Sequence, residues 1–175
     1  MQQRVAVQFT IHPQYTSPDP INNDIALIRV NQPFRFTDHV RNICLYNGSQ
    51  KVSTTRCFAN GWGAETYESQ HKLSQILKKV KMDHVDHDIC ENQLKTALKM
   101  DDFSLTDSFL CAGGNKNDLC VGDSGSPLVC PVAGEANKYV LTGISSYGIK
   151  CFTETPGVFT NVLKYHDWIR DQIEM

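Results

Sequence analysis

The segment that decides the fold of this chain is Cys120-Val121-Gly122-Asp123-Ser124-Gly125-Ser126-Pro127-Leu128-Val129-Cys130. Glycine flanks Ser124 on both sides, and glycine permits the tight turns in which a backbone approaches a substrate closely. In such a turn the neighbouring N–H groups are able to point at a developing oxyanion. A serine alone is usually a turn residue, and shorter glycine-flanked serine patterns occur in unrelated hydrolases. The full string, with a cysteine at each end, is far more specific than such a pattern.

The string Gly-Asp-Ser-Gly-x-Pro-Leu between two cysteines resembles the nucleophile loop of the chymotrypsin-like serine peptidases. The resemblance continues along nearly the whole chain in the order expected for that family. The matching segments are His12-Pro13-x-Tyr15, Asn23-Asp24-Ile25-Ala26-Leu27, Cys57 with Gly61-Trp62-Gly63, Phe109-Leu110-Cys111-Ala112-Gly113, Ser145-Ser146-Tyr147-Gly148, Pro156-Gly157-Val158-Phe159-Thr160-Asn161-Val162 and Tyr165-x-x-Trp168-Ile169. The resemblance implies an all-β, chymotrypsin-like double antiparallel barrel. Here it is truncated to the end of the first barrel, a nearly complete second barrel and a C-terminal helix.

Local patterns also predict many short strands and few helices. Runs rich in β-branched residues and bounded by turn residues indicate an antiparallel barrel or sandwich. The expected strands are residues 5–11, 25–30, 55–60, 75–82, 127–132, 139–146 and 157–162, with turns over 17–20 and 22–24. Asp86 is expected to cap a short helix near 88–95, and residues 163–173 have helical spacing. The resemblance divides the chain into a first-barrel remainder with linker (1–50), a second barrel (51–162) and a terminal helix (163–175).

The resemblance assigns the remaining catalytic groups. Asp24 stands where the family carries the aspartate that orients the catalytic histidine. Taken alone, Asp24 would read as a turn or cap residue. The backbone N–H groups of Gly122 and Ser124 are the expected oxyanion hole. The implied reaction is peptide-bond hydrolysis through an acyl-enzyme, with no cofactor and no metal.

Substrate selection is expected to depend on Asp118, which matches the bottom of the primary pocket in trypsin-like members. Gly148 and Gly157 match the pocket walls, and Ser146 and Tyr147 lie on the strand that pairs with substrate, with Tyr147 where tryptophan is usual. A guanidinium pairs with a carboxylate through two parallel hydrogen bonds, so we expect cleavage after arginine, with lysine second. The alternative is that Asp118 is a solvated loop charge.

Leu119 departs from the serine that is common beside that aspartate. Its lack of a hydroxyl removes a polar partner that would help to bind lysine, which favours arginine further. A leucine that points inward would instead shorten the pocket.

The seven cysteines predict disulfides. None forms a Cys-x-x-Cys pair, which disfavours zinc, and disulfides persist only in an oxidising compartment. A secreted, extracellular protein is therefore expected. The resemblance implies the pairs Cys57 with Cys130, Cys90 with Cys111, and Cys120 with Cys151. Cys44 is left unpaired, and in relatives an equivalent cysteine tethers the catalytic domain to a pro-segment.

Residues 1–10 lack the basic, apolar and small-residue pattern of a secretion signal. Together with the cysteines, this leads us to expect that the true beginning of the protein is missing from this sequence. The family's histidine lies well before its aspartate, so we expect it upstream of Met1, in a missing N-terminal half. The Ile/Val-Val-Gly-Gly start, whose amine pairs with the aspartate beside the serine, is also absent. Asp123 then lacks its partner, and the chain alone is expected to be inactive.

The histidines of the chain offer no substitute base. His12, His39, His71 and His166 lack an Ala-His-Cys context and are expected to be surface polar residues. A second group crowds together in the order Asp83, His84, Asp86, His87 and Asp88. One interpretation of this group is a metal site. We favour the other, a solvated bend before a short helix.

Bulk composition excludes several classes of partner. A net charge of -2 and a pI near 6.3 give no electrostatic reason to expect nucleic acid or an anionic membrane. No apolar run approaches the roughly 18 residues of a membrane span.

Two further details resemble arthropod clip-domain proteases of the phenoloxidase-activating-factor type. They are Cys130-Pro131 and the run Ile76-Leu77-Lys78-Lys79-Val80. Many such members are catalytically dead and usually carry glycine in place of the nucleophile. Ser124 therefore favours an active protease of an extracellular cascade. The alternative is a non-catalytic homologue that acts as a binding cofactor in an innate-immune or melanisation-type cascade.

Overall fold

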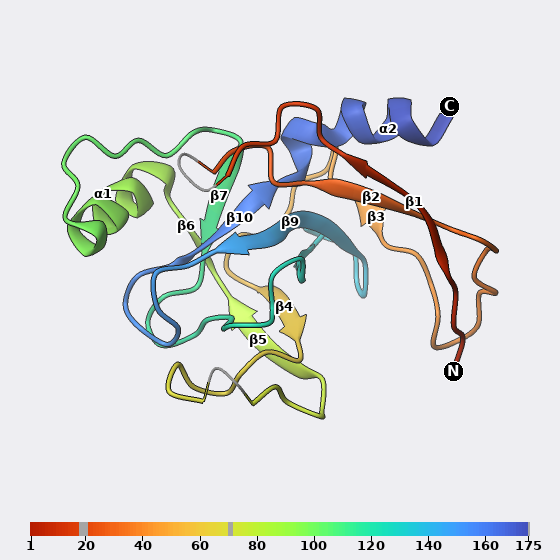
Figure 1. The fold of residues 1–175 in the computed structure, drawn as a ribbon, viewed down its shortest axis with the longest axis horizontal. Helices are drawn as coiled ribbons and strands as arrows, with labels where there is room; N and C mark the ends of the chain where they lie inside the picture. Colours follow the sequence, from red (N-terminus) through yellow and green to blue (C-terminus); the bar gives the residue numbers. More distant parts are fainter. Residues whose placement is uncertain (18–20, 70–71, 175) are drawn as a thin grey trace.

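The structure, a computed structural model, describes residues 1–17, 21–69 and 72–174. Most of its regular structure is β-strand (Figure 1). In chain order the elements are β1 (Ala6–Ile11), β2 (Ala26–Val30), β3 (Cys44–Leu45), β4 (Cys57–Gly61), β5 (Lys78–Met82), β6 (His84–Val85), α1 (His87–Leu98), β7 (Phe109–Ala112), β8 (Pro127–Pro131), β9 (Tyr139–Tyr147), β10 (Gly157–Asn161), a 3₁₀ turn (Val162–Tyr165) and α2 (His166–Glu174). His71 and most of the expected turn over 17–20 lie outside the described residues.

The larger sheet is a curled antiparallel half-barrel with strand order β5-β4-β8-β9-β10-β7-β6. The short strand β3 adds a parallel pairing along β9. Met82, Leu128 and Phe159 fill its interior together with the disulfide of Cys57 and Cys130. Strand β8 pairs with β4 on one side and β9 on the other, so the loop that carries Ser124 leads into an inner strand of the sheet.

Helix α1 begins where the sequence predicts a cap. The Asp86 carboxylate accepts hydrogen bonds from the N–H groups of Asp88 and Ile89, and so satisfies donors that a helix start leaves free. The helix is longer than expected and ends before Lys99, which adopts a left-handed conformation. Leu94 on its buried face packs against a second core cluster. No helix in the described ranges is both long and apolar enough to cross a membrane.

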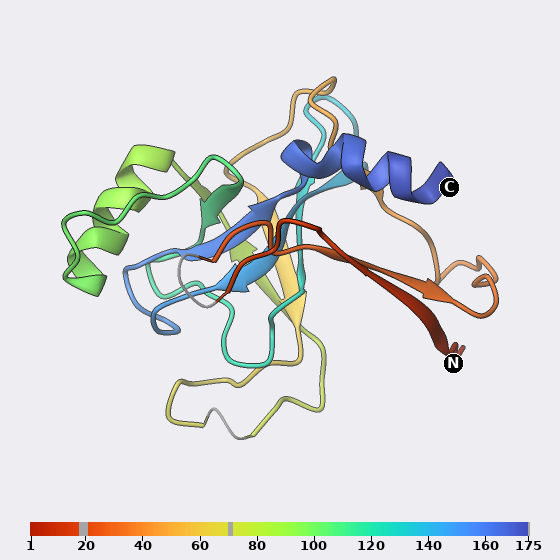
Figure 2. The ribbon, with the colours of Figure 1, turned by 45° about the horizontal axis from the view of Figure 1, so that its top comes forward.

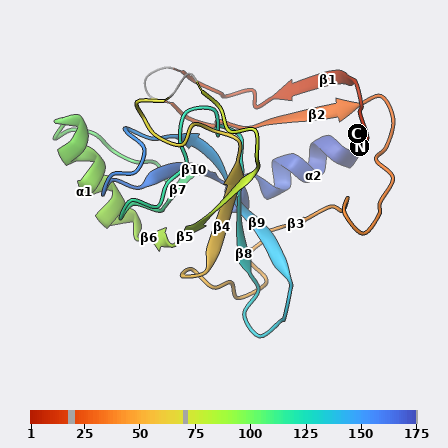
Figure 3. The same ribbon diagram turned by 90° about the horizontal axis from the view of Figure 1, so that it is seen from below.

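Strands β1 and β2 form a separate two-stranded ribbon. Helix α2 runs beside it in two views (Figures 1 and 3). The ribbon is anchored through Ile25, which packs with Val162, Tyr165 and Ile169 in a third core cluster. The smaller sheet is thus fastened to the larger one through the chain's last helical segment.

The opposite face of this ribbon is apolar and open to solvent. Phe9 and Ile28 lie opposite each other across the two strands, and their side chains are 65% and 62% exposed. Val7 and Ile11 extend the same surface. Figure 2 shows the ribbon projecting away from the larger sheet. Exposed apolar strand faces of this kind tend to associate with other protein surfaces.

Three disulfides link six of the seven cysteines. They are Cys57–Cys130, Cys90–Cys111 and Cys120–Cys151, the same pairs that the resemblance implies. Cys44 is free and exposed.

Several local expectations differ from the structure. Three strands, β3, β6 and β7, lie outside the expected ones. Strands β3 and β6 are only two residues long and are defined by pairing rather than by composition. Strand β7 is four residues long and pairs with β6 and β10. The solvated-bend interpretation is wrong for His84, which lies in β6 and is half-buried. The terminal helix starts as a 3₁₀ turn, so that its α-helical part begins only at His166.

We predict that replacing Phe9 and Ile28 together by threonine increases the monomeric, soluble fraction of this chain. Threonine keeps the strand propensity while removing apolar surface. The matched control is Leu27→Thr on the opposite face, which packs against the third core cluster. The control should lose about 0.5–3 kcal/mol of stability without gaining solubility. Size-exclusion chromatography with light scattering measures the monomeric fraction, and thermal melting measures the stability. An unmodified chain that is already monodisperse and melts cooperatively would contradict the prediction.

We further predict that Cys44 reacts with a maleimide in the native chain, at one label per molecule, because it is free and exposed. The six bonded cysteines should react only after unfolding and reduction. Mass spectrometry of peptides locates the label, and Cys44→Ser should remove both the native labelling and any disulfide-linked dimer. A bond between Cys44 and another cysteine of this chain would overturn the assignment.

Candidate active site

The loop that carries Ser124 is shaped by two glycines in left-handed conformations. Gly122 has φ of 96° and Gly125 has φ of 82°, values that disfavour residues with a side chain. The Gly125 N–H donates to the Ser145 carbonyl and the Ser145 N–H donates to the Ser126 carbonyl, at 2.8 Å each. These bonds tie the loop to β9 and leave the Ser124 side chain exposed.

Asp123 is the buried centre of this loop. Its Oδ1 accepts the Gly63 N–H at 2.7 Å, and its Oδ2 accepts the Cys120 N–H at 3.0 Å. A Cβ placed on Gly61 would lie 1.8 Å from Asp123 Oδ1, and one on Gly63 would lie 2.3 Å from Oδ2. The Gly61-Trp62-Gly63 segment is therefore required because the carboxylate occupies the space that side chains would take.

Two further N–H groups of the loop remain available. The backbone N–H groups of Gly122 and Ser124 make no hydrogen bond to any described residue. Unpaired donors beside an exposed hydroxyl are suited to hold a negatively charged oxygen.

Asp24 lies in the turn before β2 and is held by contacts from the larger sheet. The Ser146 hydroxyl donates to Asp24 Oδ2 at 2.6 Å, and the Thr160 hydroxyl donates to the Asp24 carbonyl at 2.7 Å. The preceding Asn23 has φ of 51° and accepts a hydrogen bond from the Tyr165 hydroxyl at 3.0 Å. Strands β9 and β10 and the terminal helical segment thus fix the position of a side chain carried by the smaller sheet.

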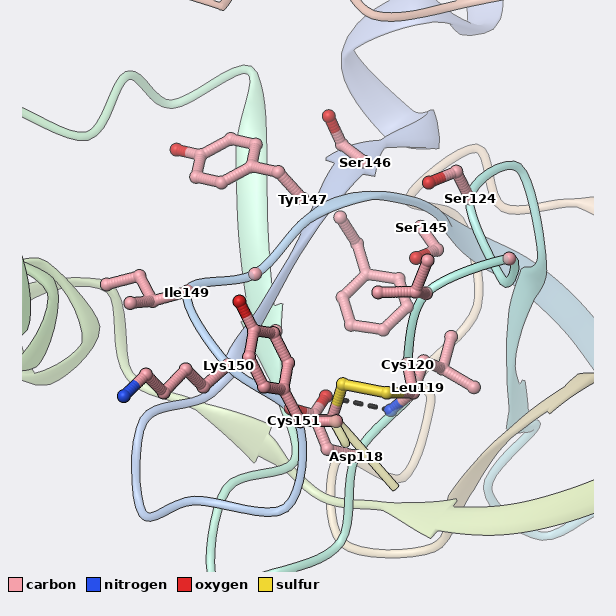
Figure 4. A pocket seen from close by; sticks show the side chains of 16 residues that line it. Asp118, Leu119, Cys120, Ser124, Ser145, Ser146, Tyr147, Ile149, Lys150 and Cys151 are labelled. Atoms are coloured by element: carbon pink, nitrogen blue, oxygen red, sulfur yellow. Dashed lines mark hydrogen bonds between the residues drawn. A yellow bond between two sulfur atoms is a disulfide. The ribbon is translucent and has the colours of Figure 1, made fainter. Parts of the chain in front are cut away.

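A pocket of about 290 Å³ opens beside Ser124. In Figure 4, Ser124 lies at one end of this pocket and Asp118 at the other, with the Cys120–Cys151 disulfide alongside. Its lining includes all the predicted substrate-binding residues, namely Asp118, Ser146, Tyr147, Gly148 and Gly157.

The two glycines that line the pocket differ in their surroundings. At Gly148 an added Cβ would meet nothing within 4 Å, and at Gly157 it would lie 3.1 Å from Asp118 Oδ1. Leu119 also lines the pocket, and it packs against the first core cluster. Tyr67 is a lining residue that sequence reasoning missed, because nothing in its local sequence shows that its loop reaches the pocket.

Asp118 is buried, with 5% of its surface exposed. Loss of hydration raises the pKa of Asp118 to about 7, although its Oδ1 accepts the Leu119 N–H at 2.8 Å. No cation pairs with Asp118 among the described residues. A buried, unpaired carboxylate is a strong receptor for a cationic group that enters the pocket.

The described histidines lie elsewhere. His39 is exposed as expected, but the surface interpretation is wrong for His12, whose half-buried ring lies 5.3 Å from Tyr165 and 5.0 Å from Trp168. His166 is also only partly exposed. No described histidine forms a hydrogen bond with Asp24 or Ser124.

The crowded acidic and histidine residues do not gather as metal ligands within the described part of the chain. The one compact group of potential ligands there is Cys57, His84 and Cys130, and its two sulfur atoms are joined in a disulfide. His84 Nε2 lies 3.4 Å from the sulfur of Cys130, and burial lowers the pKa of His84. This histidine is a core residue rather than a ligand.

The comparisons with known proteins agree with this geometry. A sequence profile described as Trypsin matches residues 1–169. The chain belongs to the trypsin family. Among proteins similar to this trypsin-family chain is phenoloxidase-activating factor 2 of Galleria mellonella, 41% identical over 153 residues that cover 86% of the chain and 50% of that protein. Another is inactive CLIP domain-containing serine protease A28 of Anopheles gambiae, 38% identical over 93% of the chain and 42% of that protein.

A solved structure supports the same fold. Neuropsin, a serine protease expressed in the limbic system of mouse brain, superposes with a TM-score of 0.80 and is 30% identical. The match covers 98% of this trypsin-family chain and 72% of neuropsin. The chain spans half or less of the length of the two insect relatives.

We predict that this trypsin-family chain, expressed as written, neither hydrolyses peptides nor reacts stoichiometrically with a fluorophosphonate. A serine hydroxyl is a weak nucleophile until a base takes its proton, and no described residue supplies that base to Ser124. Intact-mass spectrometry measures the labelling, and Ser124→Ala defines the background. Stoichiometric modification of Ser124 in the chain alone would contradict the prediction.

Proposed function

We propose that the protein is a trypsin-like serine endopeptidase that hydrolyses peptide bonds through an acyl-enzyme. Ser124 Oγ attacks the carbonyl carbon, Asp24 orients the imidazole that takes the serine proton, and the N–H groups of Gly122 and Ser124 stabilise the oxyanion. The observation that carries this proposal is the exposed Ser124 at one end of a pocket with the buried Asp118 at the other. No described histidine bonds to Asp24 or Ser124, and we propose that the imidazole belongs to the N-terminal part of the complete domain.

The order of events follows from these positions. A peptide that lies along Ser146 and Tyr147 presents its carbonyl to Ser124 while the preceding side chain enters the pocket. As the tetrahedral intermediate forms, its oxygen gains charge next to two N–H groups that have no other described partner. Loss of one such donor typically lowers kcat by about 10²–10³. The Ser146 hydroxyl holds Asp24 in place, so that its other carboxylate oxygen remains free to bond the imidazole.

Asp118 makes arginine the preferred residue before the cleaved bond. A guanidinium satisfies both oxygens of the carboxylate at once and neutralises a charge that burial makes costly. A lysine ammonium is a shorter point contact and binds second. Leu119 packs into the core cluster and contributes only its backbone N–H to Asp118, so it offers no hydroxyl to a lysine.

Compartment and partners follow from the covalent structure. Three disulfides fit a secreted, extracellular protein that acts on protein substrates. The apolar face of the β1–β2 ribbon fits the rest of a first barrel, and the exposed Cys44 fits a disulfide tether to a pro-segment. We propose that the protein acts in a proteolytic cascade, because the insect relatives include a phenoloxidase-activating factor.

A second candidate function is a non-catalytic homologue that binds a cascade partner. Its support is that three relatives that are 35–38% identical to this chain are named inactive. The complete domain separates the two proposals. An enzyme cleaves arginine peptides, whereas a binding homologue retains its fold and its pocket without hydrolysis.

We predict that benzamidine, whose amidinium mimics arginine, binds the complete domain more tightly as the pH rises through about 7. The carboxylate of Asp118 must be ionised to pair with the amidinium, and burial raises its pKa to about 7. Below that value affinity should fall roughly tenfold per pH unit, because binding then releases one proton. Calorimetry measures binding and requires no turnover. The pH dependence of the histidine's role as a catalytic base therefore does not affect the measured affinity.

The matched control is Asp118→Asn, which keeps the size of the side chain. A hydrogen bond to a charged group contributes roughly 1.5–3 kcal/mol, so benzamidine affinity should fall about 10- to 100-fold and lose its pH dependence near 7. A peptide library varied before the cleaved bond then tests substrate preference. Preference for aromatic or aliphatic residues over arginine would refute the role of Asp118.

A further inference from the structure

One short motif lies outside the active site and has no role in the proposed chemistry. Asn47-Gly48-Ser49 has the acceptor pattern for N-linked glycosylation, an asparagine followed two positions later by serine with no proline between them. It is the one tripeptide of this pattern in the sequence. The motif begins two residues after the end of β3, in the connection from β3 to β4.

The local geometry presents the asparagine amide to solvent. All three residues of the motif are exposed. Asn47 Oδ1 accepts the Ser49 hydroxyl at 2.7 Å and the Ser49 N–H at 3.1 Å. The nitrogen Nδ2 makes no hydrogen bond to any described residue. Gly48 has φ of 82°, which a glycine adopts without strain in this turn.

The fold tolerates a large substituent at this position. Strand β3 pairs with Val140 and Leu141 near the start of β9, whereas the substrate-binding Ser146 lies five residues further along that strand. At about 3.4 Å per residue, the two places are roughly 17 Å apart along the sheet. An oligosaccharide on Asn47 therefore projects into solvent and leaves the pocket beside Ser124 open.

We propose that Asn47 carries an N-linked oligosaccharide. In the transfer, Asn47 Nδ2 forms a bond to the anomeric carbon of a lipid diphosphate-linked oligosaccharide while the bond from that carbon to the phosphate oxygen breaks. The amide nitrogen loses one proton, the lipid diphosphate is the leaving group, and no oxidant is needed. The proposal rests on passage through the secretory pathway, which is part of the proposed function.

The experiment is translation of this chain, behind a cleavable secretory leader, into microsomes. Transfer to the chain is read as a slower-migrating band that peptide N-glycosidase F removes. Deglycosylation in heavy-oxygen water should leave a labelled aspartate at position 47. This readout does not require that the chain fold, so a folding defect leaves the result interpretable.

Matched variants locate the site. Asn47→Asp keeps an oxygen to accept the Ser49 hydroxyl but has no amide nitrogen, and it should abolish the shift, as should Ser49→Ala. Ser49→Thr keeps the hydroxyl and should retain the shift. A chain that is protected from protease inside the microsomes and has lost its leader, but shows no slower-migrating band, would overturn the glycosylation proposal. It would not contradict the proposal that the protein is secreted. A shift that persists in Asn47→Asp would overturn it as well.

Translation products that remain outside the microsomes would contradict glycosylation in this pathway, because the acceptor then never meets the transferase. A shift in the wild-type chain and in Ser49→Thr, absent from both Asn47→Asp and Ser49→Ala, is the expected result. Protease protection of the chain separates failure of transport from failure of modification.

Discussion

The buried carboxylate of Asp123 is the constraint on which the rest of the site depends. A charge placed in a protein interior is costly unless hydrogen bonds compensate for lost hydration. Here the compensation comes from the N–H groups of Gly63 and Cys120, each worth roughly 1.5–3 kcal/mol. The Gly63 bond joins the loop before β8 to the segment that follows β4, and the Cys120 bond closes the loop on itself. The direction of Ser124 and the openness of its neighbouring N–H groups follow from that junction.

A second constraint joins the two sheets. Asp24 lies in the turn that leads into β2, yet the hydroxyl groups that hold it come from Ser146 and Thr160 of the larger sheet. The ribbon has one face packed against the terminal helix and the other open to solvent. The carboxylate is therefore positioned by the half of the domain that also carries Ser124. Strand β9 has two roles, because its residues line the pocket beside Ser124 and its Ser146 holds Asp24.

Much of this arrangement could be predicted from the sequence, because its strongest signals are local. The string around Ser124 and the cysteine positions indicate the family, and β-branched runs such as residues 25–30 mark their strands. The short strands β3 and β6 could not be predicted, because they exist only through pairing with β9 and β7.

The surroundings of individual side chains also could not be predicted from the sequence. His84 lies in an acidic stretch that resembles a solvated bend, but its ring packs beside the Cys130 sulfur. Tyr67 reaches the pocket through the path of its loop, and no residue pattern encodes that path. The burial that raises the pKa of Asp118 also comes from distant segments, Gly157 among them. Such features depend on which chain segments meet, and sequence spacing does not determine this.

We propose that Ser124 becomes an activated nucleophile when the histidine is present. The most direct measurement is fluorophosphonate labelling of the complete, proteolytically activated domain, with the modified residue located by peptide mass spectrometry. We predict one label per molecule on Ser124, at a rate that benzamidine slows, and no label in Ser124→Ala. A correctly folded, activated domain that binds benzamidine but leaves Ser124 unlabelled would contradict the claim and favour the non-catalytic homologue.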